Sequence, residues 1–229
     1  DEDGSGSTSL SANDVDGDDL TYSISGGSDI TAELTGSDVT FSAPQDFNGS
    51  ETFSVSVSDA EYTDSQSITV TVNAVNDAPV ANAASGTTNE DQSTVIALSG
   101  SDIDGDNLTF SLNTDASNGS VTLDGSLATY TPDTDYNGDD SFSFTVSDGE
   151  YTSNADVSVS VSAVNDAPVL ATVSDVSFDE DGSGSTSLSA NDVDGDNLSY
   201  SISGGSDITA VLDGSDVAFS APQDYNGSE

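Results

Sequence analysis

Short clusters of acidic residues recur along the chain at a fixed spacing. The pattern Asp-x-Asp-Gly-Asp occurs at residues 14–18, 102–106 and 192–196. An Asp-x-Asp step places two carboxylates on the same side of an extended segment. Carboxylate, amide and backbone oxygens are the ligands of Ca²⁺, which takes about six to eight of them. The clusters therefore predict Ca²⁺ sites.

The overall charge supports an external cation and excludes several classes of function. The 229 residues include 43 Asp and Glu but no Lys, Arg or His, so the formal net charge is −43. No internal salt bridge can form, and a compact body with this charge repels itself. Without basic residues we expect no nucleic-acid partner. No run of about 18 apolar residues predicts membrane insertion, and without His, Cys or Lys we expect no enzyme.

The chain consists of repeats. Residues 75–80 (VNDAPV) recur at 164–169, and the Glu-Asp pair at residues 2–3 recurs at 90–91 and 180–181. These spacings predict three domains, at 1–77, 78–166 and 167–229, of which only the second is complete. We therefore expect the chain to be a stretch of a longer array.

Apolar and polar residues alternate within each repeat. Phe142, Phe144 and Val146 alternate with Ser143 and Thr145, and this period of two is typical of strands with one buried face. About seven such runs in about 90 residues predict an all-β fold, an antiparallel immunoglobulin-like sandwich. The aromatic residues on the apolar side of these runs are expected in the core. They are Tyr22, Phe53, Tyr130, Tyr151 and Tyr200.

The order of the acidic motifs resembles that of cadherin repeats. In the complete repeat this order is Glu90, the segment 102–106, Asp135-Tyr136-Asn137-Gly138, Asp148-Gly149 and Asn165-Asp166-Ala167-Pro168. The resemblance is to the bacterial cadherin-like form, which occurs in tandem arrays of giant secreted adhesins of the RTX and VCBS type. It implies tandem cadherin-like sandwiches in a linear array, with Ca²⁺ between successive domains.

The resemblance also implies the ligands. The first junction would use Glu2, Asp46, Asn48, Asn76 and Asp77 from one side and Asp102, Asp104 and Asp148 from the next domain. The second would use Glu90, Asp135, Asn137, Asn165, Asp166, Asp192 and Asp194. Further candidate ligands are Asp14, Asp16, Asp18, Asp59, Asp106, Glu180, Asp196 and Asp224, of which Asp18, Asp106 and Asp196 fit a solvated turn equally well. Cadherins have Glu where this chain has Asn48 and Asn137, so we expect one to three ions per junction with modest affinity.

The function implied by the resemblance is structural. The repeats would be Ca²⁺-stiffened extenders of an extracellular or cell-surface adhesin that projects a binding tip and supports adhesion and biofilm. Neighbouring repeats, identical chains in a fibre or bundle, and polysaccharide are the candidate partners. The alternatives are a Ca²⁺-dependent carbohydrate-binding or fibre-bundling module and a strand-swapped filament subunit. An acidic halophilic surface would explain the charge but not the spacing of the acids.

Overall fold

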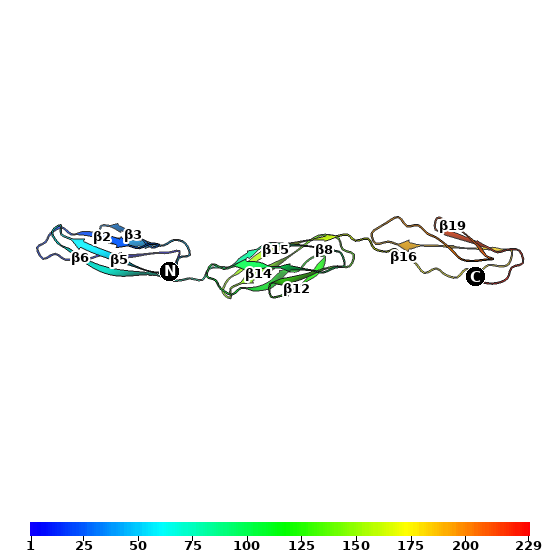
Figure 1. Ribbon diagram of the computed structural model, residues 1–229, viewed down its shortest axis with the longest axis horizontal. Coiled ribbons are helices and arrows are strands. Elements are labelled where there is room, and N and C mark those ends of the chain that lie inside the picture. The colour runs from blue at the N-terminus through cyan, green and yellow to red at the C-terminus, as the bar shows by residue number, and fades with distance from the viewer.

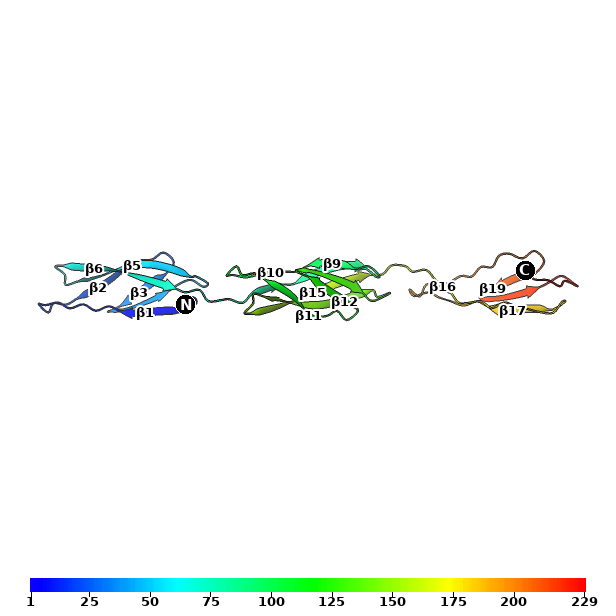
Figure 2. The ribbon, with the colours of Figure 1, turned by 90° about the horizontal axis from the view of Figure 1, so that it is seen from below.

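The computed structural model describes residues 1–229 as three groups of β-strands arranged in a line (Figures 1 and 2). We number the repeats by the boundaries predicted from the sequence. All regular elements are strands, which confirms the predicted all-β class. No helix of the structure has the length and apolarity needed to cross a bilayer.

Each repeat contributes a consecutive set of strands. The first has β1 (Ser5–Ser9), β2 (Thr21–Gly26), β3 (Thr31–Thr35), β4 (Asp38–Ser42), β5 (Gly49–Ser58) and β6 (Thr63–Val72). The second has β7 (Val80–Asn82), β8 (Ala84–Asn89), β9 (Thr94–Ala97), β10 (Ser99–Ser101), β11 (Thr109–Thr114), β12 (Gly119–Asp124), β13 (Leu127–Pro132), β14 (Gly138–Ser147) and β15 (Thr152–Ser162). The third has β16 (Val169–Leu170), β17 (Ser183–Ser187), β18 (Ala190–Asn191), β19 (Thr209–Asp213) and β20 (Asp216–Ser220).

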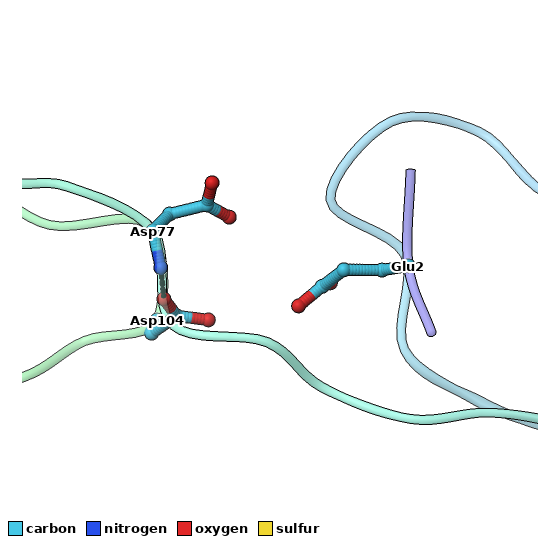
Figure 3. Close-up of side chains that lie close together, drawn as sticks. All are labelled: Glu2, Asp77 and Asp104. Carbon is cyan, nitrogen blue, oxygen red and sulfur yellow. Dashed lines mark hydrogen bonds between the residues drawn. The ribbon is translucent and has the colours of Figure 1, made fainter. Parts of the chain in front are cut away.

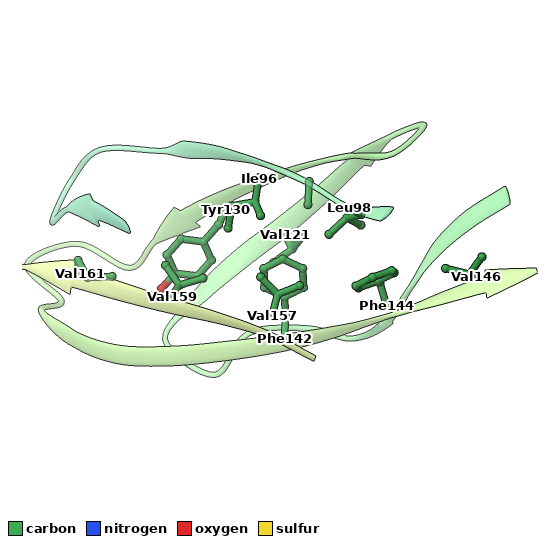
Figure 4. Packing of buried hydrophobic residues seen from close by; sticks show 11 residues of the cluster. Ile96, Leu98, Val121, Tyr130, Phe142, Phe144, Val146, Val157, Val159 and Val161 are labelled. Carbon is green, nitrogen blue, oxygen red and sulfur yellow. The ribbon is translucent and has the colours of Figure 1, made fainter. Parts of the chain in front are cut away.

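The middle repeat is a sandwich of two main sheets. One sheet has the order β11-β14-β15-β8 and the other β12-β13-β9. All pairs are antiparallel except β15 with β8, which is parallel. The alternation in β14 turns Phe142, Phe144 and Val146 inward, against Val157 of β15 and Tyr130 of β13 (Figure 4). Burial of these side chains supplies the main hydrophobic stabilisation of the repeat.

The other two repeats have smaller cores. In the first, sheets β2-β5-β6 and β1-β4-β3 enclose Ile30, Val39, Phe41 and Phe53. The rings of Phe41 and Phe53 lie 5.3 Å apart at a tilt of 59°. In the third, sheet β17-β20-β19 buries only Val217 among its hydrophobic residues.

Most of the expected aromatic core residues are at least half-buried, and one is not. Phe53 and Tyr130 are buried, and Tyr22 and Tyr200 are half-buried. The expectation for Tyr151 was wrong, because this side chain is 44% exposed. Tyr151 lies in the turn before β15, where its backbone N–H donates to Asp148 Oδ1 at 2.7 Å. It is therefore outside the strand alternation that would have turned it inward.

The outer face of sheet β2-β5-β6 carries only hydroxyl side chains. Its cross-strand positions are Thr21, Ser23, Ser25, Ser50, Thr52, Ser54, Ser56, Ser58, Thr63, Ser65, Ser67, Thr69 and Thr71. Neighbouring hydroxyls pair across the strands, at 2.8 Å for Ser56 and Ser65 and at 2.9 Å for Ser50 and Thr71. In a chain with a net charge of −43, this face has no carboxylate.

A carboxylate on the first strand of the central hairpin satisfies backbone donors in each repeat. Glu51 accepts N–H groups from Ser28, Asp29 and Ile30 at 2.9–3.1 Å. Glu229 receives the same three bonds from residues 206–208. Hydrogen bonds from the Ser28 hydroxyl and from the backbone lower the pKa of Glu51 to about 2. These carboxylates hold the turn before β3 or β19 in place.

Asp140 does the same in the middle repeat, where it is only 8% exposed. It accepts N–H groups from Ser117 and Asn118 and the Tyr130 hydroxyl at 2.9–3.1 Å. Burial raises the pKa of Asp140, but these bonds outweigh burial and lower it below the usual range. This carboxylate is thus stabilised by protein donors alone.

The Glu51 bonds predict a defined pH dependence. The pKa of Glu51 is about 2 in the folded chain against an ordinary value of 4.5, so its stabilisation is complete above about pH 4.5 and is lost as the pH falls towards 2. We expect Glu51→Gln to lower the melting temperature at pH 6, and the difference from wild type to vanish near pH 2. Circular dichroism melts across this range measure it.

The control is Glu33→Gln, which removes an exposed carboxylate from β3 of the same repeat. A Glu51→Gln difference that is independent of pH, or equal to that of Glu33→Gln, would contradict the role of Glu51.

Candidate metal centre

Three carboxylates from distant parts of the chain meet between the first and second repeats. Glu2 precedes β1, Asp77 lies in the linker after β6, and Asp104 lies in the loop between β10 and β11. One oxygen of each lies within 4.8 Å of the others. Glu2 is 7% exposed, and its carboxylate faces Asp77 and Asp104 (Figure 3). The group therefore joins the two repeats.

Backbone donors of the linker fix this geometry. The Glu2 N–H donates to the Asn73 carbonyl at 2.9 Å, and the Val75 N–H donates to Glu2 Oε1 at 2.5 Å. The Asp77 N–H donates to Asp104 Oδ2 at 2.8 Å. Glu2 is thus attached to its own linker, and Asp104 of the next repeat is attached to the same linker.

The second junction repeats this arrangement. Glu90, Asp166 and Asp194 lie within 4.8 Å of one another through one oxygen each, and Glu90 is 3% exposed. The Val164 N–H donates to Glu90 Oε1, and the Asp166 N–H donates to Asp194 Oδ2 at 2.7 Å. The Glu90 N–H donates to the Ser162 carbonyl at 2.9 Å. Glu, linker Asp and loop Asp are therefore brought together at both junctions, as the resemblance implied.

A second triad shares the linker aspartate at each junction. The first consists of Asp3, Asp46 and Asp77. The second consists of Asp91, Asp135 and Asp166. The sequence analysis missed Asp3 and Asp91, although each directly follows the glutamate that was selected.

The shared aspartates carry buried oxygens without partners. Asp77 Oδ2, Asp166 Oδ2, Glu2 Oε2 and Asp102 Oδ2 are shielded from solvent and accept no hydrogen bond. Burial, and then the charges of Asp46, Asp104, Asp3 and Glu2, raise the pKa of Asp77. The pKa of Asp166 is raised for the corresponding reasons. An unpaired buried carboxylate is costly, and an all-oxygen, all-anionic donor set fits a hard cation such as Ca²⁺.

The Asp-x-Asp-Gly-Asp loops have a common turn at their first aspartate. Asp102 Oδ1 accepts N–H groups from Asp104 and Asp106 at 3.0 and 3.3 Å. The corresponding bonds, at 2.8–3.3 Å, join Asp14 to Asp16 and Asp18, and Asp192 to Asp194 and Asp196. Asp106 is within 4.8 Å of Asp102 and Asp104, whereas Asp18 and Asp196 belong to no such carboxylate cluster.

Asp148 reaches the junction through a linker amide. The Asn76 Nδ2 donates to Asp148 Oδ2 at 2.9 Å. Burial raises the pKa of Asp148, but the bonds from Asn76 and from the N–H groups of Glu150 and Tyr151 lower it overall. Its counterpart Asp59 accepts the N–H groups of Tyr62 and Glu61, which lower its pKa. Asp148 thus connects the second repeat to the linker.

The remaining predicted ligands lie outside the triads. Asn137 donates to Glu90 Oε2 at 3.3 Å, whereas Asn48 is exposed and makes no corresponding bond to Glu2. Asn165 Nδ2 donates to the Asp166 carbonyl at 2.9 Å. Asp14 and Asp59 line one hollow of the first repeat, near the loop between β1 and β2. Glu180 is exposed, and the Asp224 N–H donates to Asp181 Oδ1 at 3.1 Å.

The comparison by sequence gives one match. A family model described as a bacterial Ig domain matches residues 1–71 and 76–160. No curated protein matches the chain.

Solved structures resemble the chain only distantly. A fragment of human protocadherin-24 (EC1-2) is 20% identical with a TM-score of 0.48, over 68% of this chain and 87% of that one. Drosophila N-cadherin EC1-4 is 16% identical with a TM-score of 0.48, over 95% and 61% of the two chains. An endo-fucoidan hydrolase from glycoside hydrolase family 107 is 20% identical with a TM-score of 0.34, over 90% of this chain and 34% of that one. This chain therefore spans about a third of the hydrolase, and none of these likenesses extends to function.

The buried charge of Asp77 predicts opposite effects with and without Ca²⁺. In excess chelator, Asp77→Asn removes an unpaired buried charge, so we expect the melting temperature to rise. In millimolar Ca²⁺ the same change removes a ligand, so we expect it to fall. Circular dichroism melts of the whole chain measure both.

Asp156→Asn is the control, because it removes the same charge from an exposed position on β15. Asp77→Asn and Asp156→Asn melts that shift alike in both buffers would contradict a cation site at Asp77.

Proposed function

The chain belongs to the family of bacterial Ig domains, and we propose that its repeats are structural extender modules that Ca²⁺ makes rigid at each junction. The observation that carries this proposal is the pair of interdomain carboxylate groups with buried, unpartnered oxygens. Each group takes Asp104 or Asp194 from one repeat and a glutamate and linker aspartate from the repeat before it. A cation held there joins consecutive repeats.

The residues at the junction act as a conditional hinge. Without a cation, Glu2, Asp77 and Asp104 repel one another within 4.8 Å, and the chain has no basic side chain to offset them. A bound Ca²⁺ supplies positive charge and accepts oxygen ligands from both repeats. Ca²⁺ sites of extracellular modules commonly have dissociation constants of about 10⁻⁴–10⁻³ M. Such sites would be filled outside the cell and empty inside it.

The linear arrangement supports an extender role (Figure 2). Bacterial Ig domains are typically exposed on the cell surface. We therefore propose an extracellular location, on a long adhesin or surface fibre that projects a binding tip and supports adhesion and biofilm. The proposal is non-enzymatic: carboxylates are the only ionised side chains at neutral pH, and no His, Cys or Lys is present to act as a base or nucleophile.

A second candidate function is lateral bundling of identical chains. The hydroxyl face of β2-β5-β6 favours it, because two copies can meet there without placing carboxylates against each other. Hydroxyls donate and accept hydrogen bonds, so this face can pair with itself around a two-fold axis. The face of one repeat is small, so bundling would depend on many repeats acting together.

Small-angle X-ray scattering tests the extender role. In millimolar Ca²⁺ we expect a narrow distribution of interatomic distances, as for a stiff rod. In chelator we expect a broader distribution with a smaller mean end-to-end distance, because the junctions flex. Mg²⁺ should not replace Ca²⁺, since it keeps several of its waters and demands octahedral geometry.

The variant Asp104→Asn/Asp194→Asn should scatter in Ca²⁺ as wild type does in chelator. The control is Asp124→Asn/Asp156→Asn, which removes the same charge from exposed strand positions. Identical wild-type profiles in Ca²⁺ and chelator would sink the extender proposal, and a concentration series tests bundling.

A further inference from the structure

Asp77 belongs to two carboxylate triads whose other members differ in origin. One triad joins it to Glu2 and to Asp104 of the next repeat. The other joins it to Asp3 and Asp46, which belong to the same repeat as Asp77. The first triad therefore exists only when two repeats are docked, whereas the second is complete within one repeat and its linker. The second junction has the same division around Asp166.

Asp3 is held in a fixed relation to Asp46. The Asp46 N–H donates to Asp3 Oδ1 at 3.2 Å, and both residues have positive φ, of 58° and 57°. Asp91 and Asp135 repeat this contact at 3.2 Å. Asp181 and Asp224 repeat it at 3.1 Å. The contact uses only one oxygen of Asp3, so the other is available for a ligand.

The unpartnered oxygens give separate support for a ligand. Asp77 Oδ2 and Asp166 Oδ2 are shielded from water and accept no hydrogen bond. Glu2 is more than nine-tenths buried, and its Oε2 also lacks a partner. Buried acceptors of this kind require a donor or a cation, and the chain contains no basic side chain to supply one.

The charge of the two triads exceeds what one divalent cation can neutralise. Glu2, Asp3, Asp46, Asp77 and Asp104 together carry −5 when ionised. One Ca²⁺ would leave −3 among overlapping groups, whereas two would leave −1. Asn48, two residues after Asp46, offers only a neutral amide and is exposed. Asp3 supplies a carboxylate that Asn48 does not.

We propose that each junction has a second Ca²⁺ site, formed by Asp3, Asp46 and Asp77 at the first junction and by Asp91, Asp135 and Asp166 at the second. This inference rests on the proposed function and deepens it. The second site fills independently of the next repeat and orders the linker aspartate. The site that contains Glu2 or Glu90 then couples that aspartate to the following repeat. Asp3 and Asp91 are the residues that distinguish the two sites.

Counting bound Ca²⁺ by isothermal titration calorimetry on the whole chain tests the inference. We expect Asp3→Asn/Asp91→Asn to bind one ion fewer per junction than the control Asp124→Asn/Asp156→Asn. We expect Asp104→Asn/Asp194→Asn to lose the interdomain ion at each junction and to keep the ion beside Asp3 or Asp91. Asp3→Gly/Asp91→Gly is the second variant, because glycine tolerates the positive φ and removes the carboxylate without backbone strain.

The outcomes separate the inference from the proposed function. If both Asp3/Asp91 variants bind as many ions as the control, with unchanged affinity, the second site is overturned and the extender role stands. If wild type binds no Ca²⁺, both fail. If the two pairs of variants each lose a different ion, the second site is supported.

Discussion

The structure depends on negative charge that the chain cannot neutralise by itself. Each junction gathers carboxylates from two repeats within 4.8 Å, in a protein without a single Lys, Arg or His. Hydrophobic burial holds each sandwich together, but it does not extend across the linkers. The angle between repeats is therefore controlled by electrostatics, and a cation from the surroundings determines whether the junction is attractive or repulsive.

The environment of each carboxylate separates those that support the fold from those that need a cation. Glu51 and Glu229 lie beside backbone donors, which lower their pKa to about 2, and donors also outweigh burial at Asp140. Asp77 and Asp166 are shielded without enough donors, and neighbouring anions raise their pKa further. The first group is complete with protein partners alone. The second group, at the junctions, is where binding a cation changes the shape of the array.

Sequence patterns predicted the fold class and much of the junction, because both follow from local rules. Alternation places Phe142 and Phe144 in the core, and the repeated motifs identify Glu2, Asp77 and Asp104 and their counterparts. Asp3 and Asp91 escaped prediction because their role depends on a left-handed backbone and on contact with a residue more than 40 positions away. Asn48 was expected at the junction but lies exposed. Tyr151 was placed in the core, because its turn interrupts an alternation that the sequence pattern assumes to continue.

The central claim is that cations occupy the carboxylate groups between repeats. A crystal structure of the whole chain grown in millimolar Ca²⁺, with anomalous data that identify calcium, tests it most directly. The account predicts anomalous peaks at both junctions, bounded by the oxygens of Asp77 and Asp104 and of Asp166 and Asp194. Water alone between these carboxylates, at a Ca²⁺ concentration that saturates extracellular sites, would contradict it.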